Sequence, residues 1–139
     1  TTPTGHEGYV SSVQFFAQDR YLVSGSGDSS VKVWDLERKH IVRNITSAHR
    51  ADVLCVSTSK LANHVFLTAG AEGTVIFHDH RVEQPLFSVG KFTSDVGAIK
   101  FHQNGMKVIA GSFDGSCCIF DSRKPGPELC EYTVPGVVL

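Results

Sequence analysis

Short stretches of alternating apolar and polar residues, separated by turn-forming residues, run along the whole chain. Val31 and Val33 alternate with Lys32 and Trp34, which is the two-residue period of a β-strand. Clusters of Gly, Asp and Ser, such as residues 26–30, are typical of hairpin turns. No stretch sustains a helical period. The pattern predicts an all-β protein with strands at Val10–Phe15, Tyr21–Ser24, Val31–Asp35, Ile41–Ile45, Val53–Val56, Phe66–Thr68, Thr74–Asp79, Pro85–Val89, Val96–Phe101, Lys107–Ala110, Ser116–Asp121 and Leu129–Thr133.

An internal repeat organises these strands. Segments 5–37, 48–81 and 91–123 align, so that His6, His49 and Phe92 share one position and lie 43 residues apart. We expect repeats at about 5–47, 48–90 and 91–134, with the start of a further repeat at 135–139. Each repeat should form one four-stranded antiparallel sheet, because it contains four strand signals joined by short turns.

Four polar positions of the first repeat can form one hydrogen-bonded chain. We expect Asp28 to accept from His6, and Ser24 to lie between His6 and the indole N–H of Trp34, which would satisfy buried polar groups. A Ser-His-Asp hydrolase triad is an alternative interpretation, but the repeat already explains these residues and no nucleophile elbow is present. The second repeat carries His49, Thr68, Glu72 and His78 at these positions, and the third carries Phe92, Ala110, Asp114 and Phe120.

These motifs resemble the WD repeats of β-propellers, which have a period of about 40–45 residues. The segments GHEGYVSSVQF, SGSGDSSVKVWDLE and TSDVGAIKFHQNGMKVIAGSFDGSCCIFDSR are more narrowly similar to the β subunit of heterotrimeric G proteins. The resemblance implies three consecutive blades of a seven-bladed ring, so we expect the chain to be a central fragment or a truncated product.

The resemblance also implies a binding surface for a G-protein α subunit. In that family the loops that enter the first strand of each blade contact the α subunit, and the matching positions here are Glu7, Tyr9, Asp52 and Asp95. Glu7 departs from the small hydroxyl residue of the family pattern, and Phe113 stands where the family has an acidic contact residue. The alternative interpretation is that Asp52 and Asp95 only cap turns.

Composition and charge exclude several other classes. Thirteen basic and 14 acidic residues give a net charge of −1, which provides no general attraction to nucleic acid or anionic membranes. The apolar stretches are too short for a membrane-spanning helix, so no direct membrane insertion is expected. The pattern of the four cysteines does not look like a disulfide framework, so we expect buried, reduced thiols. Adjacent Cys117 and Cys118 would point to opposite faces of a strand, and we do not expect them to pair with each other.

Two further motifs have structural interpretations. His78 and His80 could share one strand face and bind a metal, but a third ligand is missing, so no metal or other cofactor is expected. Asp79-x-Arg81 and Asp121-x-Arg123 resemble the WDxR box of cullin–RING ubiquitin ligase receptors, although both lack the Trp. The structural alternative is an Asp–Arg pair that ties adjacent strands.

The main hypothesis is a non-catalytic, G-protein β-subunit-like propeller that transduces receptor signals. The resemblance implies α and γ subunits and effectors as partners, and a cytoplasmic location at the inner face of the plasma membrane through those partners. A general WD-repeat scaffold or cullin–RING ligase substrate receptor is the alternative. A propeller hydrolase needs converging carboxylates or histidines at the central channel, which the repeats do not supply.

Overall fold

The computed structural model describes residues 5–16, 18–46, 48–60, 64–82, 84–89, 92, 94–102, 107–121 and 132–133. Alternation of apolar and polar residues and the turn chemistry between them divide this part of the chain into short strands. The strands are β1 (Val10–Phe16), β2 (Tyr21–Ser26), β3 (Val31–Asp35), β4 (His40–Ile45), β5 (Val53–Thr58), β6 (Val65–Gly70), β7 (Val75–Asp79), β8 (Phe87–Val89), β9 (Val96–Phe101), β10 (Lys107–Ser112), β11 (Cys117–Asp121) and β12 (Tyr132–Thr133).

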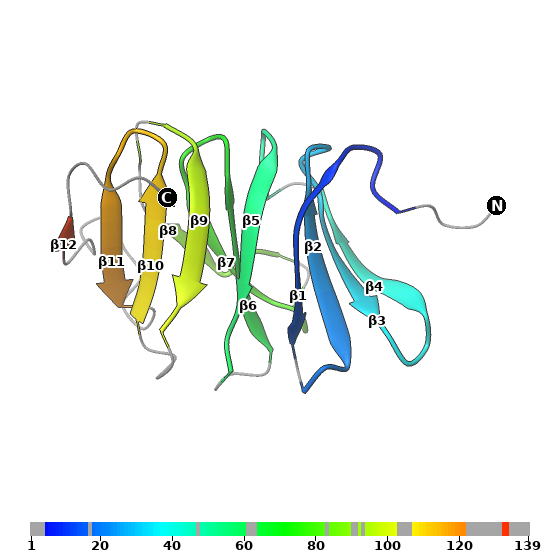
Figure 1. Cartoon of the computed structure of the whole chain (residues 1–139). Helices are drawn as coiled ribbons and strands as arrows, with labels where there is room; N and C mark the ends of the chain where they lie inside the picture. Colours follow the sequence, from blue (N-terminus) through cyan, green and yellow to red (C-terminus); the bar gives the residue numbers. More distant parts are fainter. Residues whose placement is uncertain are drawn as a thin grey trace.

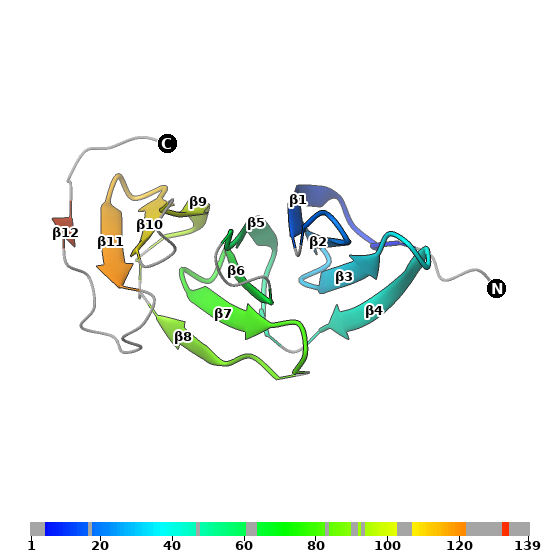
Figure 2. The same cartoon turned by 90° about the horizontal axis from the view of Figure 1, so that it is seen from below.

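The strands form three four-stranded sheets, called the first, second and third blades below. Their strand orders are β1-β2-β3-β4, β5-β6-β7-β8 and β9-β10-β11-β12, and every pairing is antiparallel. Figure 2 shows the blades side by side, with β1, β5 and β9 along one edge of the row and β4 and β8 along the other. The predicted all-β architecture of three consecutive blades is confirmed, and the described residues contain no helix.

The second strand of each blade is longer than the sequence pattern predicts. Strands β2, β6 and β10 continue to Ser26, Gly70 and Ser112, two residues beyond the predicted ends. The prediction ended this strand at Ser24 and placed the turn at residues 26–30, but Gly25 pairs within the sheet and packs on the next blade. A Cβ at Gly25 would lie 2.5 Å from Val53 Cγ1, so the glycine allows close contact between the blades.

Apolar side chains fill the two spaces between blades. The cluster between the first and second blades includes Val23, Val31, Val33, Val53 and Phe66. The cluster between the second and third blades is built from Cys55, Leu67, Ala69, Val75, Phe77, Val96, Ile99, Val108, Ala110 and Cys118. Polar side chains on the first strands add hydrogen bonds across the same interfaces: Gln14 Oε1 accepts from the N–H of Thr58 (3.0 Å), and Ser57 Oγ accepts from the N–H of Phe101 (3.1 Å).

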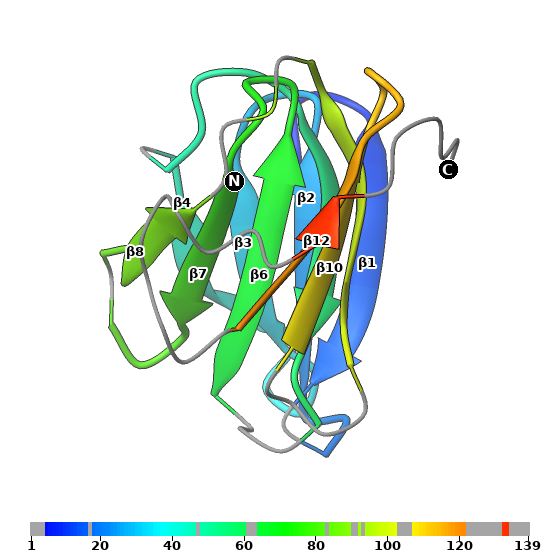
Figure 3. The same cartoon turned by 90° about the vertical axis from the view of Figure 1, so that its left-hand side faces the viewer.

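Corresponding loops of the three blades lie at one end of the strands. The turns β2–β3, β6–β7 and β10–β11 and the starts of β1, β5 and β9 are all at the top of Figure 1. Figure 3 views the row of blades from the side of the third blade, and neighbouring strands such as β6 and β7 point in opposite directions, as antiparallel pairing requires. These loops and turns are called the upper rim below.

One cysteine differs from the expectation of reduced thiols. Cys55 and Cys117 are free and buried, and burial raises the pKa of Cys55 to about 12. Cys118, however, is disulfide-bonded. The register of β11 with β12 places Cys118 opposite Thr133. Cys130 lies outside the described residues.

Candidate functional site

A continuous hydrogen-bond chain crosses the first blade from Trp34 to Asp28. The indole N–H of Trp34 donates to Ser24 Oγ (2.9 Å), and Ser24 Oγ lies 2.6 Å from His6 Nε2. Because an indole only donates, the Ser24 hydrogen is left for His6 Nε2, and His6 carries its own proton on Nδ1. That Nδ1–H faces Ser30 Oγ (2.9 Å) and Asp28 Oδ2 (3.3 Å). These hydrogen bonds hold the loop before β1 against the β2–β3 turn.

Ser30 belongs to this chain although the repeat alignment does not single it out. Its hydroxyl receives the shorter contact from His6 and donates to Asp28 Oδ1 (2.5 Å), while its N–H donates to the same oxygen (2.8 Å). The signal was available in the sequence, because Asp followed two residues later by Ser is a local turn motif. Asp28 is therefore linked to His6 both directly and through the Ser30 hydroxyl.

The Ser24–His6–Asp28 geometry resembles a hydrolase triad but lacks a free nucleophile. Ser24 is 3% exposed, and its oxygen already accepts from Trp34 while its hydrogen is directed at His6. Burial lowers the pKa of His6 and outweighs the opposing effect of Asp28. A substrate carbonyl has no access to Ser24 Oγ, so this arrangement is a structural element of the blade.

We expect Trp34→Phe to destabilise the protein by about 1–2 kcal/mol, because Ser24 Oγ loses its donor in a buried site. A double-mutant cycle with Ser24→Ala, followed by urea unfolding, isolates the shared hydrogen bond. The two substitutions should be non-additive by a similar amount. Additive changes in the free energy of unfolding would show that the hydrogen bond between Trp34 and Ser24 does not stabilise the protein.

The second blade builds the same chain from different residues. His49 Nδ1 lies 2.8 Å from Glu72 Oε1, and Thr68 Oγ1 lies 2.6 Å from His49 Nε2 and 2.8 Å from His78 Nε2. His78 thus occupies the place of Trp34 and supplies a ring N–H. It is 1% exposed and stacks on Phe66 with ring centroids 4.8 Å apart. Burial, assisted by nearby His49, lowers the pKa of His78 to about 3, so the ring is neutral near pH 7.

The third blade keeps the turn part of the hydrogen-bond chain, and its histidine and hydroxyl positions are apolar. Asp114 Oδ1 accepts from the N–H of Ser116 (2.8 Å) and from its hydroxyl (2.5 Å), as Asp28 does from Ser30. Phe92 and Ala110 replace the histidine and the hydroxyl residue, and both pack in or against the apolar cluster between the second and third blades. Loss of both hydrogen-bond partners together is tolerated, because no buried polar group is left alone.

Tyr9, Asp52 and Asp95 occupy the same structural position in consecutive blades. Their backbone carbonyls accept from the N–H groups of Gly27, Ala71 and Phe113, each at 2.9 Å. Each bond joins the loop before a first strand to the turn after a second strand, so all three residues lie on the upper rim. The repeat spacing predicted equivalent positions, and the backbone geometry is the same in all three blades.

The rim residues of different blades also interact directly. The Tyr9 hydroxyl donates to Asp52 Oδ2 (2.6 Å), which links the first blade to the second. This bond, together with the charges of Asp52 and Asp95, raises the pKa of Tyr9. The Tyr9 ring is 54% exposed and lies against Gly27, where an added Cβ would come within 2.1 Å of Tyr9 Cε1. Glu7 is exposed nearby, and its N–H donates to Asp28 Oδ2 (2.8 Å).

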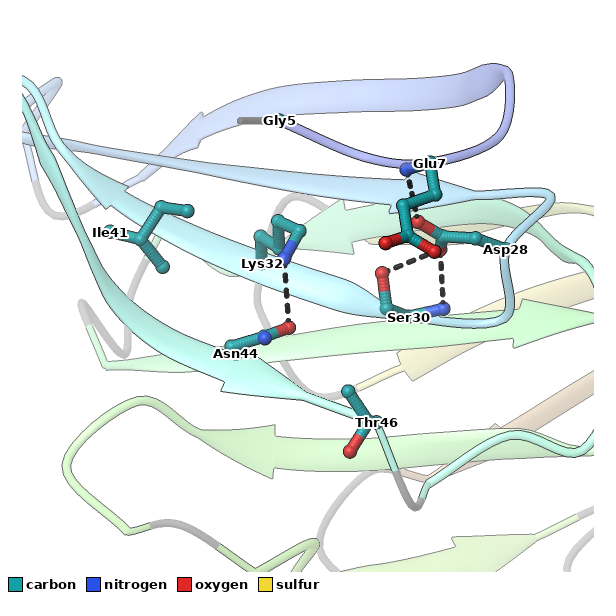
Figure 4. A pocket seen from close by; sticks show the side chains of 8 residues that line it. All are labelled: Gly5, Glu7, Asp28, Ser30, Lys32, Ile41, Asn44 and Thr46. Atoms are coloured by element: carbon teal, nitrogen blue, oxygen red, sulfur yellow. Dashed lines mark hydrogen bonds between the residues drawn. The ribbon is translucent and has the colours of Figure 1, made fainter. Parts of the chain in front are cut away.

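A pocket of about 400 Å³ lies beside the first blade, between the N-terminal loop and strands β3 and β4 (Figure 4). It is lined by Gly5, Glu7, Asp28, Ser30, Lys32, Ile41, Asn44 and Thr46. Lys32 Nζ donates to Asn44 Oδ1 (3.0 Å), and the Asp28 oxygens accept from Ser30 and from the N–H of Glu7. Since these bonds engage the carboxylate of Asp28, it is not available as a general base.

The other two sequence motifs have local roles. Strand β7 ends at Asp79, so His80 lies in the following turn, where its ring packs on Phe16 and Tyr21. Across the described ranges, no three His, Cys, Asp or Glu side chains gather as a metal site would require. The Arg81 guanidinium donates to both Asp79 oxygens (2.7 and 3.0 Å), so this pair closes a turn within the second blade. Arg123 lies outside the described residues.

Comparison with known proteins adds a family to this geometry. The family model described as "WD domain, G-beta repeat" matches residues 1–35 and 84–121, just over half of the chain. The chain belongs to the WD-repeat family. This family accounts for the three antiparallel blades and for the His, Ser, Asp and Trp positions that recur with changes in each WD repeat.

Curated relatives and solved structures are similar over most of this WD-repeat chain. A guanine nucleotide-binding protein subunit beta from Solanum tuberosum is 36% identical over 138 residues, which cover 95% of this chain and 36% of that protein. The subunit beta from Saccharomyces cerevisiae is 29% identical over 124 residues, which cover 86% of this chain and 29% of that protein. The chain thus spans about a third of the length of these relatives.

The similar structures are longer chains as well. The β-propeller domain of Cps50 (Swd1) from Myceliophteria thermophila has a TM-score of 0.81 and 26% identity, over 98% of this chain and 42% of that one. A chain of the mitotic checkpoint complex has a TM-score of 0.82 and 25% identity, over 94% of this chain and 40% of that one.

In the part of this chain that the structure describes, no helix is long and apolar enough to cross a bilayer.

Proposed function

We propose that this WD-repeat chain forms part of a G-protein β-subunit-like propeller that transduces receptor signals by binding an α subunit at the upper rim. The contact residues are Tyr9, Asp52 and Asp95, with Glu7 beside them. A γ subunit and effectors bind elsewhere, and these partners hold the protein at the cytoplasmic face of the plasma membrane. The repeat boundaries in this proposal are 5–47, 48–90 and 91–134, with a further repeat from 135.

The observation that carries this proposal is the bond from Tyr9 to Asp52 across two blades. It fixes an exposed aromatic ring beside two carboxylates, Asp52 and Asp95, at equivalent rim positions. Exposed aromatic residues often dominate the energy of protein interfaces, and nearby charges accelerate association with a partner of opposite charge. The similarity to subunit beta proteins supports an α subunit as that partner.

We also propose that the protein is not an enzyme. Ser24, which a hydrolase triad would use as its nucleophile, is buried, and its oxygen accepts a hydrogen bond from Trp34. The carboxylate of Asp28 accepts hydrogen bonds that stabilise the β2–β3 turn. The carboxylate of Glu72 likewise accepts from His49 and from the N–H of Arg50. These groups stabilise the blades, and a catalytic role would require them to release the bonds that hold the rim.

Replacing Tyr9 tests the proposed binding surface. In the full-length protein, Tyr9→Ala should weaken binding to the GDP-bound α subunit about ten- to a hundredfold, mostly through faster dissociation. The melting temperature should hardly change, because the ring is exposed. Surface plasmon resonance on purified subunits and thermal unfolding measure the two effects.

Two further variants separate the ring from the charges. Tyr9→Phe keeps the ring but loses the bond to Asp52, so its effect should be smaller than that of Tyr9→Ala. Asp52→Asn should mainly slow association and reduce its salt dependence. If Tyr9→Ala binds the α subunit like the unaltered protein, the rim is not the docking surface, and a general WD-repeat scaffold or ubiquitin ligase receptor becomes the better assignment.

A further inference from the structure

Lys32 is a buried lysine near the start of β3. It is 8% exposed, and its Nζ donates to Asn44 Oδ1 (3.0 Å). An ammonium carries three N–H groups, so two remain for a further acceptor. Among the described residues, no carboxylate forms an ion pair with Lys32 Nζ. Because buried charges in proteins are normally paired, Lys32 lacks the negative partner that its burial calls for.

The fold does not require a lysine at this position. Strand pairing places Lys32 opposite Asn44 in the first blade and Ile76 opposite Ser88 in the second. In the third blade the same position of the repeat is Cys118. Ile76 and Cys118 are uncharged, and each is 6% exposed. An uncharged side chain therefore fits this buried position, and folding alone does not explain the charge of Lys32.

The pocket beside the first blade gives the Lys32 ammonium space for a ligand. Figure 4 shows Lys32 and Asn44 on the strand side of this pocket, and Glu7 and Asp28 on the side of the loop and the turn. Since Asn44 Oδ1 accepts from Lys32, the amide N–H groups of Asn44 remain as donors. Thr46, which follows β4, adds an exposed hydroxyl to the lining. The strand side therefore offers hydrogen-bond donors, and the opposite side carries carboxylates.

A blade packed against this face would leave the mouth of the pocket open. The second blade shows the arrangement, because Ile76 lies on the same sheet face as Phe66, which packs in the cluster between the first and second blades. There Ser88, the counterpart of Asn44, is exposed although Ile76 is buried. In a longer propeller, a blade before the first one should likewise leave Asn44 accessible.

A single carboxylate is the group that complements this pocket. One of its oxygens can accept from the Lys32 ammonium and the other from the amide of Asn44 or the hydroxyl of Thr46. The second negative charge of a phosphate would find no further cation in the lining and would face Glu7 and Asp28. A cationic ligand would be repelled by Lys32.

We propose that this pocket binds the carboxylate of an Asp or Glu side chain from a partner protein, and that Lys32 forms the ion pair with it. The partner segment is acidic and docks on the side of the first blade, beside β4. The inference goes beyond the proposed function and does not depend on what binds the upper rim. Glu7 lines the pocket as well, so it disfavours partner segments with several adjacent negative charges.

The test is an NMR titration of the isotope-labelled full-length protein with a short peptide. The peptide Gly-Ala-Glu-Ala-Gly is acetylated and amidated, so that Glu carries its only charge. It should bind weakly and shift the amide signals of Asn44 and Thr46. A matched peptide with Gln in place of Glu should bind about tenfold more weakly, because it lacks the charge that pairs with Lys32.

Variants of Lys32 locate the interaction. Lys32→Met keeps the apolar stem but removes the ammonium, and should weaken binding of the Glu peptide about tenfold. Lys60→Met is the matched control, because it removes the same charge from an exposed lysine that follows β5. It should bind the peptide like the unaltered protein. If Lys32→Met does not fold, Lys32→Gln makes the same comparison.

Three results would overturn the proposal. The first is equal binding of the Glu and Gln peptides, and the second is equal affinity of the Lys32→Met and Lys60→Met variants for the Glu peptide. The third is displacement of the Glu peptide by an equal concentration of inorganic phosphate, which would show a general anion site. None of these measurements involves the α subunit, so a failure of the proposed function leaves this inference intact.

Discussion

Lowering the pH from 7 to 4.5 should destabilise this protein by about 2–3 kcal/mol through His78 alone. Burial lowers the pKa of His78 to about 3, whereas the same side chain in the unfolded chain has a pKa of 6.5. Below pH 6.5 the unfolded state binds a proton that the folded state does not bind. The stabilisation is therefore present above pH 6.5 and is lost progressively as the pH falls toward 3.

Urea unfolding of His78→Gln across this pH range tests the assignment. Glutamine can still donate to Thr68 but does not titrate, so the variant should lose most of the acid dependence even if it is less stable at pH 7. His40→Gln is the matched control, because His40 is an exposed histidine on β4. An unchanged pH slope in His78→Gln would show that other groups account for the acid sensitivity.

The strands were predictable because each obeys a local rule. A period of two residues and a cluster of Gly, Asp or Ser are both visible in the sequence, and they located every blade. Strand ends were less predictable, because a glycine indicates either a turn or a close contact. Gly25 continues β2 since Val53 of the next blade packs on it, and this contact exists only after the blades have assembled.

The hydrogen-bond chain was predictable for a similar reason, and the rim contacts were not. Asp28, His6, Ser24 and Trp34 lie within one blade, so the repeat pattern alone brings them together. The bond from Tyr9 to Asp52 depends on the angle between two blades, and no spacing within one repeat specifies that angle.

Removing the carboxylate of Asp28 should destabilise the protein by about 2–4 kcal/mol. Its oxygens accept from the N–H and hydroxyl of Ser30 (2.8 and 2.5 Å), from the N–H of Glu7 (2.8 Å) and from His6 Nδ1 (3.3 Å). Burial alone would raise the pKa of Asp28, but the bonds from Ser30 and Glu7 outweigh burial and hold this pKa far below its usual range. Asp28→Ala leaves these donors without their acceptor and detaches the loop before β1 from the turn.

Asp114→Ala provides a matched comparison within the same chain. Asp114 accepts from the N–H and hydroxyl of Ser116 in an equivalent turn, but Phe92 stands at the histidine position of its blade. This substitution should cost less than Asp28→Ala, because Asp114 is exposed and its blade has no histidine ring N–H to donate to it. Urea melts of both variants measure the difference in stability loss, which includes the contribution of the link from Asp28 to His6, because the third blade has Phe92 at the histidine position. Equal losses from the two substitutions would mean that the aspartate stabilises only its own turn and that the chain from Trp34 to Asp28 adds nothing to the first blade.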